Sequence, residues 1–341
     1  MSWLSRFFLS TWQRRGLAAQ MLRPAAALYA YALRRRAAHF VSPPRAQRPP
    51  IIVVGNIVIG GVGKTPIVIA LVQYLQRLGY RPGVVSRGYG RQSGSGAVLA
   101  VTRHTPAAQA GDEPLLIAQA TGAPVFVAAN RPAALAALCA AHPQVNIVIS
   151  DGGLQHWALA RDIEVLVWDG RGLGNGYLLP AGMLREPWPR HAWHPYAGQT
   201  HILHLYAGAK QPDFLPAAAA WPSARRLADF ALRADGTRCS LTSLQTQRLQ
   251  AVAGIAQPEA FLTDLRAQGL RLSHTVALPD HADLAAWWQT LAAAQQQGIW
   301  LCTQKDAVKL WAVCPAAWAV PLQIDLPAGF TTALNAALNA S

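Results

Sequence analysis

Acidic residues and lysines are scarce in this chain. Its 341 residues hold 16 Asp and Glu against 30 Lys and Arg, which gives a formal net charge of +14, and no acidic residue precedes Asp112. So basic a protein attracts an anionic partner: nucleic acid, an anionic membrane surface or a phosphorylated substrate. No zinc finger, RNA-binding signature or ladder of basic and aromatic residues occurs, which argues against nucleic acid. Lysine stands at four positions only, namely Lys64, Lys210, Lys305 and Lys309.

Cysteine is also rare, and apolar runs are short. The four cysteines are widely spaced and form no Cys-x-x-Cys pair, so we expect ordinary reduced thiols in a cytosolic compartment. The apolar stretch within the first 40 residues is interrupted by Arg23-Pro24, which argues against a continuous membrane span of about 20 residues. No compact apolar region followed by a small-residue cleavage site occurs there, which argues against a signal peptide.

Residues 1–45 combine aromatic residues with two arginine clusters, at 14–15 and 34–36. Pro24 predicts a kink between two helices. Aromatic and basic residues without carboxylates are typical of a segment that lies in the headgroup plane of an anionic membrane. The alternative is a helical hairpin that packs on the protein's own core. The candidate interfacial anchors are Trp3, Phe7, Phe8 and Trp12.

Residues 51–65, IIVVGNIVIGGVGKT, carry the most specific motif. A β-branched run leads into a glycine-rich turn that ends in Lys-Thr, and a helix-compatible segment follows, as in a phosphate-binding loop. Glycines let backbone N–H groups approach the phosphates, and the helix points its positive end at the same anion. Lys64 is expected to reach the β- and γ-phosphates of ATP, and Thr65 to ligate Mg²⁺. The predicted nucleotide-binding residues are Asn56, Gly60, Gly61, Val62, Gly63, Lys64, Thr65 and Pro66.

Val58 departs from the usual form of this motif, which has glycine at that position. The chain carries the pair Gly60-Gly61 instead, a variant typical of partition ATPases and metabolite kinases. The lysine that precedes this pair in many partition ATPases is Ile59 here. The alternative is a glycine-rich turn with a chance Lys-Thr.

Strand-like and helix-like segments alternate after this loop, which predicts an α/β protein with a doubly wound parallel sheet of the P-loop NTPase type. The length suggests about two domains. We predict membrane-associated helices in residues 1–45, a P-loop kinase core in 46–221 and a smaller α/β domain in 222–341. The stretch 212–222, rich in proline and alanine, is predicted to be a linker or irregular connection.

A few polar residues outside the loop could carry chemistry. Asp151 ends an apolar strand, where a carboxylate near the nucleotide's Mg²⁺ is expected, although it could instead cap a helix. Asp112-Glu113 stands in a turn before a helix predicted at 115–121 and suits a base, a metal contact or a cap. His281 lies in a loop of the second unit, where a histidine on its own is often structural. Lys305-Asp306 could form a salt-bridged turn.

Together these segments resemble the tetraacyldisaccharide 4′-kinases, the lipid A kinases of Gram-negative bacteria. The similarity extends from the N-terminal helix to about residue 315 and rests on eight segments in the family's order. They are VVGN…GGVGKTP, SRGYGR, GDEP, DGGLQH, LPAGMLREP, AGIAQPEAF, PDHAD and TQKDAVKL.

The resemblance implies that Asp112 is the catalytic base, with His281 as its partner, and that Lys64 and Thr65 hold phosphate and Mg²⁺. It implies further active-site positions at Arg87, Glu113, Asp151, His156, Arg185 and Glu186. The chain departs from the family's pattern at three positions. Gly152 replaces a second aspartate beside Asp151, Ala282 replaces a histidine, and Gln304 replaces a glutamate.

The family transfers the γ-phosphate of ATP to the 4′-hydroxyl of a tetraacylated glucosamine disaccharide 1-phosphate, forming lipid IVA. Such an enzyme is expected at the cytoplasmic face of the inner membrane, with the acylated disaccharide and the anionic membrane surface as its partners. One alternative is a membrane-associated P-loop ATPase that switches between partners without lipid chemistry. Another is a soluble metabolite kinase, which leaves residues 1–45 unexplained.

Overall fold

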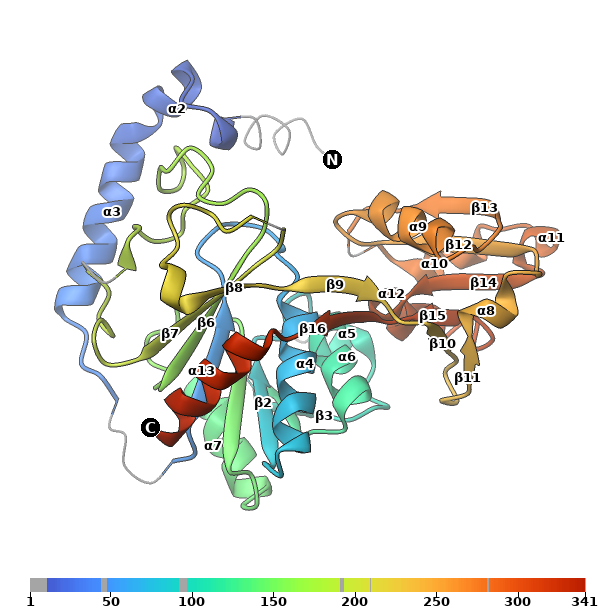
Figure 1. Ribbon diagram of the computed structural model, residues 1–341, viewed down its shortest axis with the longest axis horizontal. Coiled ribbons are helices and arrows are strands. Elements are labelled where there is room, and N and C mark those ends of the chain that lie inside the picture. Colours follow the sequence, from blue (N-terminus) through green and yellow to red (C-terminus); the bar gives the residue numbers. More distant parts are fainter. Residues whose placement is uncertain are drawn as a thin grey trace.

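An eight-stranded sheet forms the centre of the larger unit (Figure 1). The computed structural model describes residues 11–43, 48–91, 97–190, 193–208, 210–280 and 282–340. The strand order is β3-β4-β2-β5-β1-β6-β7-β8, and all neighbours are parallel except β3 and β4. The strands are β1 (Ile51–Gly55), β2 (Pro82–Ser86), β3 (Leu99–Val101), β4 (Val125–Val127), β5 (Ile147–Asp151), β6 (Ile163–Trp168), β7 (His201–Tyr206) and β8 (Ala220–Pro222).

Apolar, β-branched sequences explain the burial of the central strands. Every residue of β1, β5 and β6 is buried, and Ile52 of β1 lies between Ile149 and Ile163 in the ladder. Strands of a parallel sheet read as continuous hydrophobic runs because helices cover both of its faces. The predicted α/β class with a mostly parallel sheet is therefore confirmed. The predicted linker at 212–222 is partly wrong, since its last residues form the edge strand β8.

Four helices connect the strands of the first half of this sheet: α4 (Lys64–Arg77), α5 (Ala107–Ala110), α6 (Asp112–Thr121) and α7 (Arg131–Ala141). Helix α6 begins three residues earlier than predicted. Gly111 precedes it with φ of 88°, a conformation that favours glycine. Pro114 falls in the first turn, where its missing N–H breaks no intrahelical hydrogen bond. Asp112 and Glu113 therefore lie on the first turn of a helix rather than in a turn before it.

The smaller unit is built on a six-stranded sheet of order β11-β10-β15-β14-β12-β13. Its strands are β10 (Phe230–Leu232), β11 (Arg238–Ser240), β12 (Leu249–Ala253), β13 (Leu272–Ala277), β14 (Ile299–Thr303) and β15 (Trp318–Val320). Its helices are α8 (Leu241–Leu244), α9 (Pro258–Ala267), α10 (Leu284–Gln289), α11 (Ala293–Gln296) and α12 (Gln304–Leu310). Two separate apolar clusters pack on this sheet, one with α9 and the other with α10 and α12.

A two-stranded antiparallel ribbon joins the two units, formed by β9 (Ala224–Leu227) and β16 (Leu322–Asp325) (Figure 1). After this ribbon the chain returns to the larger unit, where α13 (Ala328–Asn339) contacts β7 and β8. Phe330, Leu334 and Ala337 belong to the large core. The predicted assignment of all residues from 222 to the smaller domain is therefore wrong for the C-terminal helix.

The N-terminal segment forms two helices, α2 (Leu17–Met21) and α3 (Arg23–Ala38). Pro24 lies at the start of α3, where it is tolerated, instead of kinking a continuous helix. One side of α3 packs on the larger unit, because Leu33 is buried with Trp157 and Tyr196. Of the predicted anchors, Trp12 is described and donates from Nε1 to Pro180 O at 2.9 Å. Trp3, Phe7 and Phe8 lie outside the described residues.

Other apolar side chains of this segment are exposed to solvent, and together they are called the apolar strip. Each member keeps between 62% and 85% of its surface exposed, and the members are Leu17, Met21, Leu28, Tyr31 and Val41. No helix within the described ranges combines the length and apolarity that a membrane crossing requires. Packing on the protein's own core is therefore confirmed for the part of this segment around Leu33, and contact of the exposed part with a membrane stays a prediction.

Candidate active site

The phosphate-binding loop runs from the end of β1 to the start of α4. Gly63 precedes the helix in a left-handed conformation, with φ of 75°. Asn56 fixes the loop from within, since its Nδ2 donates to Val58 O at 2.5 Å and its Oδ1 accepts from Lys64 Nζ at 3.3 Å. Thr65 is buried in the first turn of α4. The predicted strand, loop and helix are therefore present, with Lys64 and Thr65 at the helix N-terminus.

Val58 has a structural reason to differ from glycine. It forms an antiparallel bridge with Leu184, while Ile59 N donates to Met183 O at 2.9 Å and Arg185 N donates to Ile57 O at 2.7 Å. The first half of the loop is therefore a short ladder with the LREP segment. Val58 is buried there, and its side chain contributes to the core.

Two arginines hold the backbone of the loop from outside, and sequence reasoning did not identify either. Arg171 donates from Nη1 to Ile59 O at 3.1 Å, and Asp169 orients it by accepting from Nη2 at 2.7 Å. Arg225, on β9 of the ribbon, donates from Nη2 to Val62 O at 2.5 Å. A Cβ atom on Gly63 would lie 2.8 Å from that same nitrogen. These contacts join residues more than 100 positions apart, so no local pattern could have revealed them.

Asp151 lies at the carboxyl end of β5, as predicted. Ser86, at the end of the neighbouring β2, has its Oγ 3.5 Å from Asp151 Oδ2. Burial and then Glu113 raise the pKa of Asp151 to about 7, and Lys64 opposes that rise. These interactions place Asp151, Glu113 and Lys64 in one cluster at the carboxyl edge of the sheet. The alternative of a helix cap does not hold, because Asp151 is the last residue of a strand.

The donors of this cluster fit a magnesium ion that is bound together with a nucleotide. Within the described ranges, no three His, Cys, Asp or Glu side chains gather as a preformed metal centre. Mg²⁺ commonly takes one or two protein oxygens beside phosphates and waters. Asp151 and the Thr65 hydroxyl supply such oxygens, and a cation would offset the cost of burying an ionised carboxylate. At Gly152, where the family resemblance implies a second aspartate, an added Cβ would meet no atom within 4 Å.

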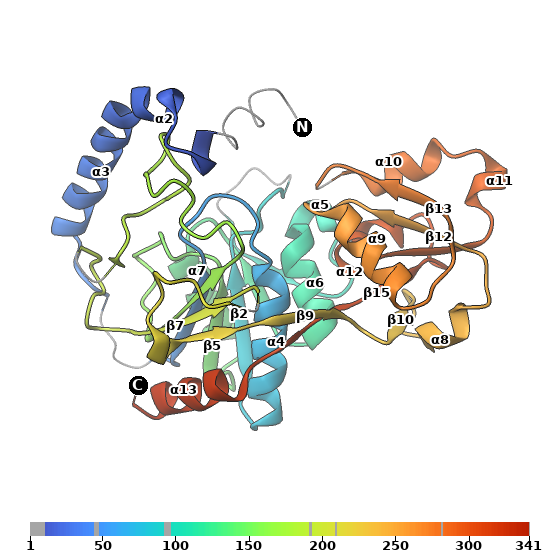
Figure 2. The ribbon, with the colours of Figure 1, turned by 45° about the horizontal axis from the view of Figure 1, so that its top comes forward.

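Asp112 meets the smaller unit across the domain interface. Its Oδ2 lies 2.7 Å from Lys309 Nζ on α12, which packs against α6 (Figure 2). His281 lies outside the described residues. On either side of it, Asp280 pairs with Lys305 at 2.9 Å, and Ala282 O accepts from Lys309 at 3.2 Å. The predicted salt bridge within Lys305-Asp306 is therefore replaced by one between Lys305 and Asp280.

Arg87, Arg131 and His156 form a basic group near Asp151. Burial, followed by the positive charges of Arg131, Arg161, Arg36 and Arg87, lowers the pKa of His156 to about 4. Burial and Arg87 lower the pKa of Arg131 to about 10, against the effect of Asp151. Within the described chain, Arg131 Nε and His156 Nε2 are buried without a hydrogen-bond partner. The arginines of this group, together with the unpaired buried nitrogens, favour the binding of an anionic ligand. Arg131 was not among the predicted site residues, although it is the first residue of α7, the helix that follows β4.

Glu186 belongs to a buried ionic network. It is fully buried and faces Arg190, whose Nε is 3.1 Å from Glu186 Oε1. Arg190 also pairs with Glu164, which pairs in turn with Arg161 at 3.0 Å. Burial raises the pKa of Glu186, and Arg190 opposes this. Arg185 precedes Glu186 in the chain, and its backbone carbonyl accepts a hydrogen bond from the Tyr29 hydroxyl of α3 at 2.7 Å.

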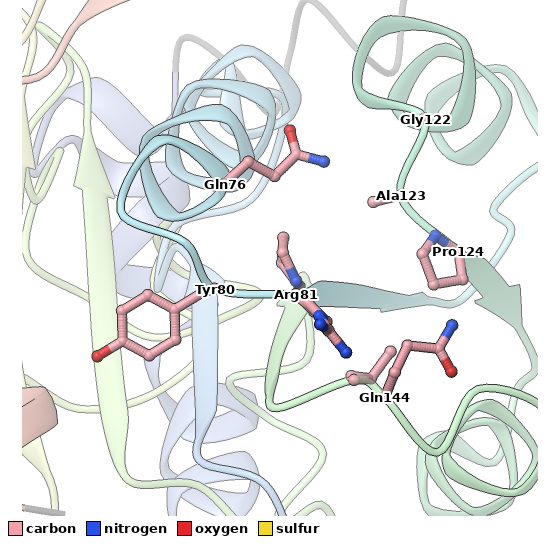
Figure 3. A pocket seen from close by; sticks show the side chains of 9 residues that line it. Gln76, Tyr80, Arg81, Gly122, Ala123, Pro124 and Gln144 are labelled. Atoms are coloured by element: carbon pink, nitrogen blue, oxygen red, sulfur yellow. The ribbon is translucent and has the colours of Figure 1, made fainter.

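A surface pocket of about 260 Å³ lies elsewhere, at the amino ends of β2 and β4 (Figure 3). Its lining includes Gln76, Tyr80, Arg81, Pro124 and Gln144. Sites of parallel α/β sheets form at the carboxyl ends of the strands, which is where Lys64 and Asp151 lie. This pocket is therefore remote from the phosphate-binding loop.

Comparison with known proteins adds an independent line of evidence. A family model described as tetraacyldisaccharide-1-P 4′-kinase matches residues 18–339. A tetraacyldisaccharide 4′-kinase of Polaromonas naphthalenivorans is 47% identical over 98% of this chain and 95% of its own length. One of Bordetella parapertussis is 44% identical over 93% of this chain and 91% of its own length.

A solved structure shares the fold. LpxK from Aquifex aeolicus, determined in complex with ATP, superposes with a TM-score of 0.75. It is 24% identical and covers 94% of this chain and 99% of its own. The two-unit architecture is thus that of an experimentally determined protein.

Proposed function

This chain belongs to the tetraacyldisaccharide-1-P 4′-kinase family, and we propose that it transfers the γ-phosphate of ATP to the 4′-hydroxyl of a tetraacylated glucosamine disaccharide 1-phosphate, which yields lipid IVA. The observation that carries this proposal is the meeting of two groups at one edge of the sheet. Lys64 and Asp151 cluster with Glu113, and the adjacent Asp112 contacts α12 of the smaller unit. The phosphate loop and the predicted base therefore come together between the two units.

The loop performs the electrostatic part of the transfer. Backbone N–H groups at the start of α4 and the Lys64 ammonium bind the phosphates and stabilise the charge that develops on the transferred group. Thr65 and Asp151 would hold Mg²⁺. When bound, this ion neutralises charge between the phosphates. Asn56 positions Lys64 for this task through the hydrogen bond at 3.3 Å.

The acceptor hydroxyl requires a base and a fixed orientation. Asp112 lies on the first turn of α6, and the two residues that flank His281 in the sequence, Asp280 and Ala282, contact Lys305 and Lys309. A carboxylate with a histidine partner can accept the proton of the sugar hydroxyl as the phosphoryl group is transferred. Arg87 and Arg131 add positive charge near Asp151, His156 lies beside them as a neutral imidazole, and this group would orient an anionic part of the substrates.

We also propose that the protein acts at the cytoplasmic face of the inner membrane. An acylated substrate leaves the bilayer at a cost of about 0.8 kcal/mol for each buried CH₂ group, so the enzyme must bring its site to the headgroups. The apolar strip of the N-terminal segment, close to the arginine clusters at 14–15 and 34–36, suits such a surface.

The proposal is tested by incubation with labelled ATP and a vesicle-embedded disaccharide 1-phosphate acceptor. Wild-type protein should phosphorylate the acceptor. Lys64→Ala should lower turnover on the order of 10³-fold, because it removes charge stabilisation of the transferred group. Lys210→Ala, which removes an exposed lysine, serves as the matched control and should keep full activity.

The same assay separates the alternative function. A P-loop ATPase switch would hydrolyse ATP slowly without any acceptor and would dimerise when nucleotide binds. Labelled phosphate that appears only as free phosphate, together with nucleotide-dependent dimers, would refute the kinase proposal in favour of the switch.

A further inference from the structure

Lys309 contacts Asp112 from the smaller unit. The distance between Lys309 Nζ and Asp112 Oδ2 is 2.7 Å, and the two side chains are only 18% and 10% exposed. A carboxylate so far removed from water is costly to keep ionised unless a positive group compensates its charge. Lys309 supplies that charge across the interface between the two units.

The position of Lys309 is defined by the start of its helix. Thr303 caps α12 by accepting from Asp306 N at 3.1 Å. The buried Asp306 carboxylate accepts from Thr303 Oγ1 at 2.7 Å and from Gly254 N at 2.9 Å. These bonds tie the first turn of α12 to the ends of β12 and β14. One turn later, Lys309 is therefore presented to α6 from a rigid support.

Two lysines, spaced one helical turn apart, contact the residues on either side of position 281. Lys305 pairs with Asp280 at 2.9 Å, and Lys309 donates to Ala282 O at 3.2 Å. Ala282 N in turn donates to Pro279 O at 3.1 Å. Both lysines thus act within the smaller unit, and Lys309 also forms the ion pair with Asp112 of the larger one.

We propose that Lys309 is a positioning residue that joins Asp112 to Ala282 and so assembles the base across the domain interface. This inference rests on the proposed role of Asp112. An ammonium group has three donors. One N–H of Lys309 orients the Asp112 carboxylate, and another donates to Ala282 O. A single side chain therefore sets the placement of Asp112 relative to Ala282, the residue that follows His281 in the sequence.

The test compares Lys309→Met, Lys309→Arg and the control Lys210→Met, with kcat and the KM for ATP measured on the full chain. Loss of a charge-assisted hydrogen bond corresponds to about a 10- to 100-fold effect. Lys309→Met should lower kcat by that amount and leave the KM for ATP within about threefold. Lys309→Arg should recover part of the loss. Lys210→Met should stay within about threefold of wild type, because it removes an exposed lysine outside the site.

The background of Asp112→Asn shows whether Lys309 acts through Asp112. In that background, Lys309→Met should cause little further loss, since residues that act as one unit are not additive. If Asp112→Asn keeps wild-type activity, the proposed role of Asp112 is wrong. If Asp112→Asn is inactive but Lys309→Met stays active, or if the two losses multiply fully, the inference about Lys309 alone is overturned. Should Lys309→Met fail to fold, Lys309→Gln replaces it, with melting curves as the check.

Discussion

Arg225→Met tests whether the ribbon between the two units supports the phosphate-binding loop. The guanidinium of Arg225 donates to Val62 O at 2.5 Å and lies against Gly63. A hydrogen bond from a charged group contributes about 1.5–3 kcal/mol, and the lower end applies because the Arg225 side chain is partly exposed. About 1.5 kcal/mol corresponds to roughly tenfold. We therefore expect ATP to bind about tenfold more weakly to the variant, because the loop loses part of its fixed shape.

Arg226→Met is the matched control on the same strand. Arg226 pairs with Asp325 at 3.0 Å, but the two side chains are 54% and 59% exposed, so this pair should contribute less than about 1 kcal/mol. Titration calorimetry with ATP at moderate salt measures both variants, and melting curves confirm their folding. Equal losses for both variants, or unchanged affinity for Arg225→Met, would refute the assignment of a supporting role to Arg225.

Two further outcomes follow from surface and core residues. Replacing the members of the apolar strip by serine should reduce sedimentation of the protein with anionic vesicles, while its ATP affinity stays unchanged. Equal sedimentation of variant and wild type would show that the strip does not contact the membrane. Substitution is preferred to deletion because α3 also packs on the core. Burial lowers the pKa of His204 to about 4, and its Nδ1 accepts from Trp168 at 3.1 Å, so the neutral form is favoured in the folded state. Stability should therefore be full above the unfolded pKa of about 6.5 and fall as the pH drops toward 4, by on the order of 3 kcal/mol at most. In urea titrations the stability of His204→Gln should fall less steeply than that of wild type over this range, while His156 keeps part of the pH dependence and the exposed His201→Gln behaves like wild type. Parallel curves for His204→Gln and wild type would contradict the assignment.

The phosphate-binding loop was predictable from the sequence because its determinants are local. The conformation of Gly63, the apolar strand before it and the helix after it lie within some 25 consecutive residues. The same holds for Asp151, since the end of an apolar run marks the end of a strand and parallel strands end at a common edge. The family resemblance likewise rested on short segments in a fixed order, and the comparisons confirm it.

Contacts between distant segments were decided only by the tertiary structure. The hold of Arg225 on Val62, the return of α13 to the large core and the pair of Lys309 with Asp112 join residues far apart in the chain. Hydrophobic pattern and turn chemistry specify elements, but they do not specify which side chains meet when two units pack. Val58 illustrates this difference: in the sequence it is a departure from a motif, and in the fold it is a buried partner of Leu184.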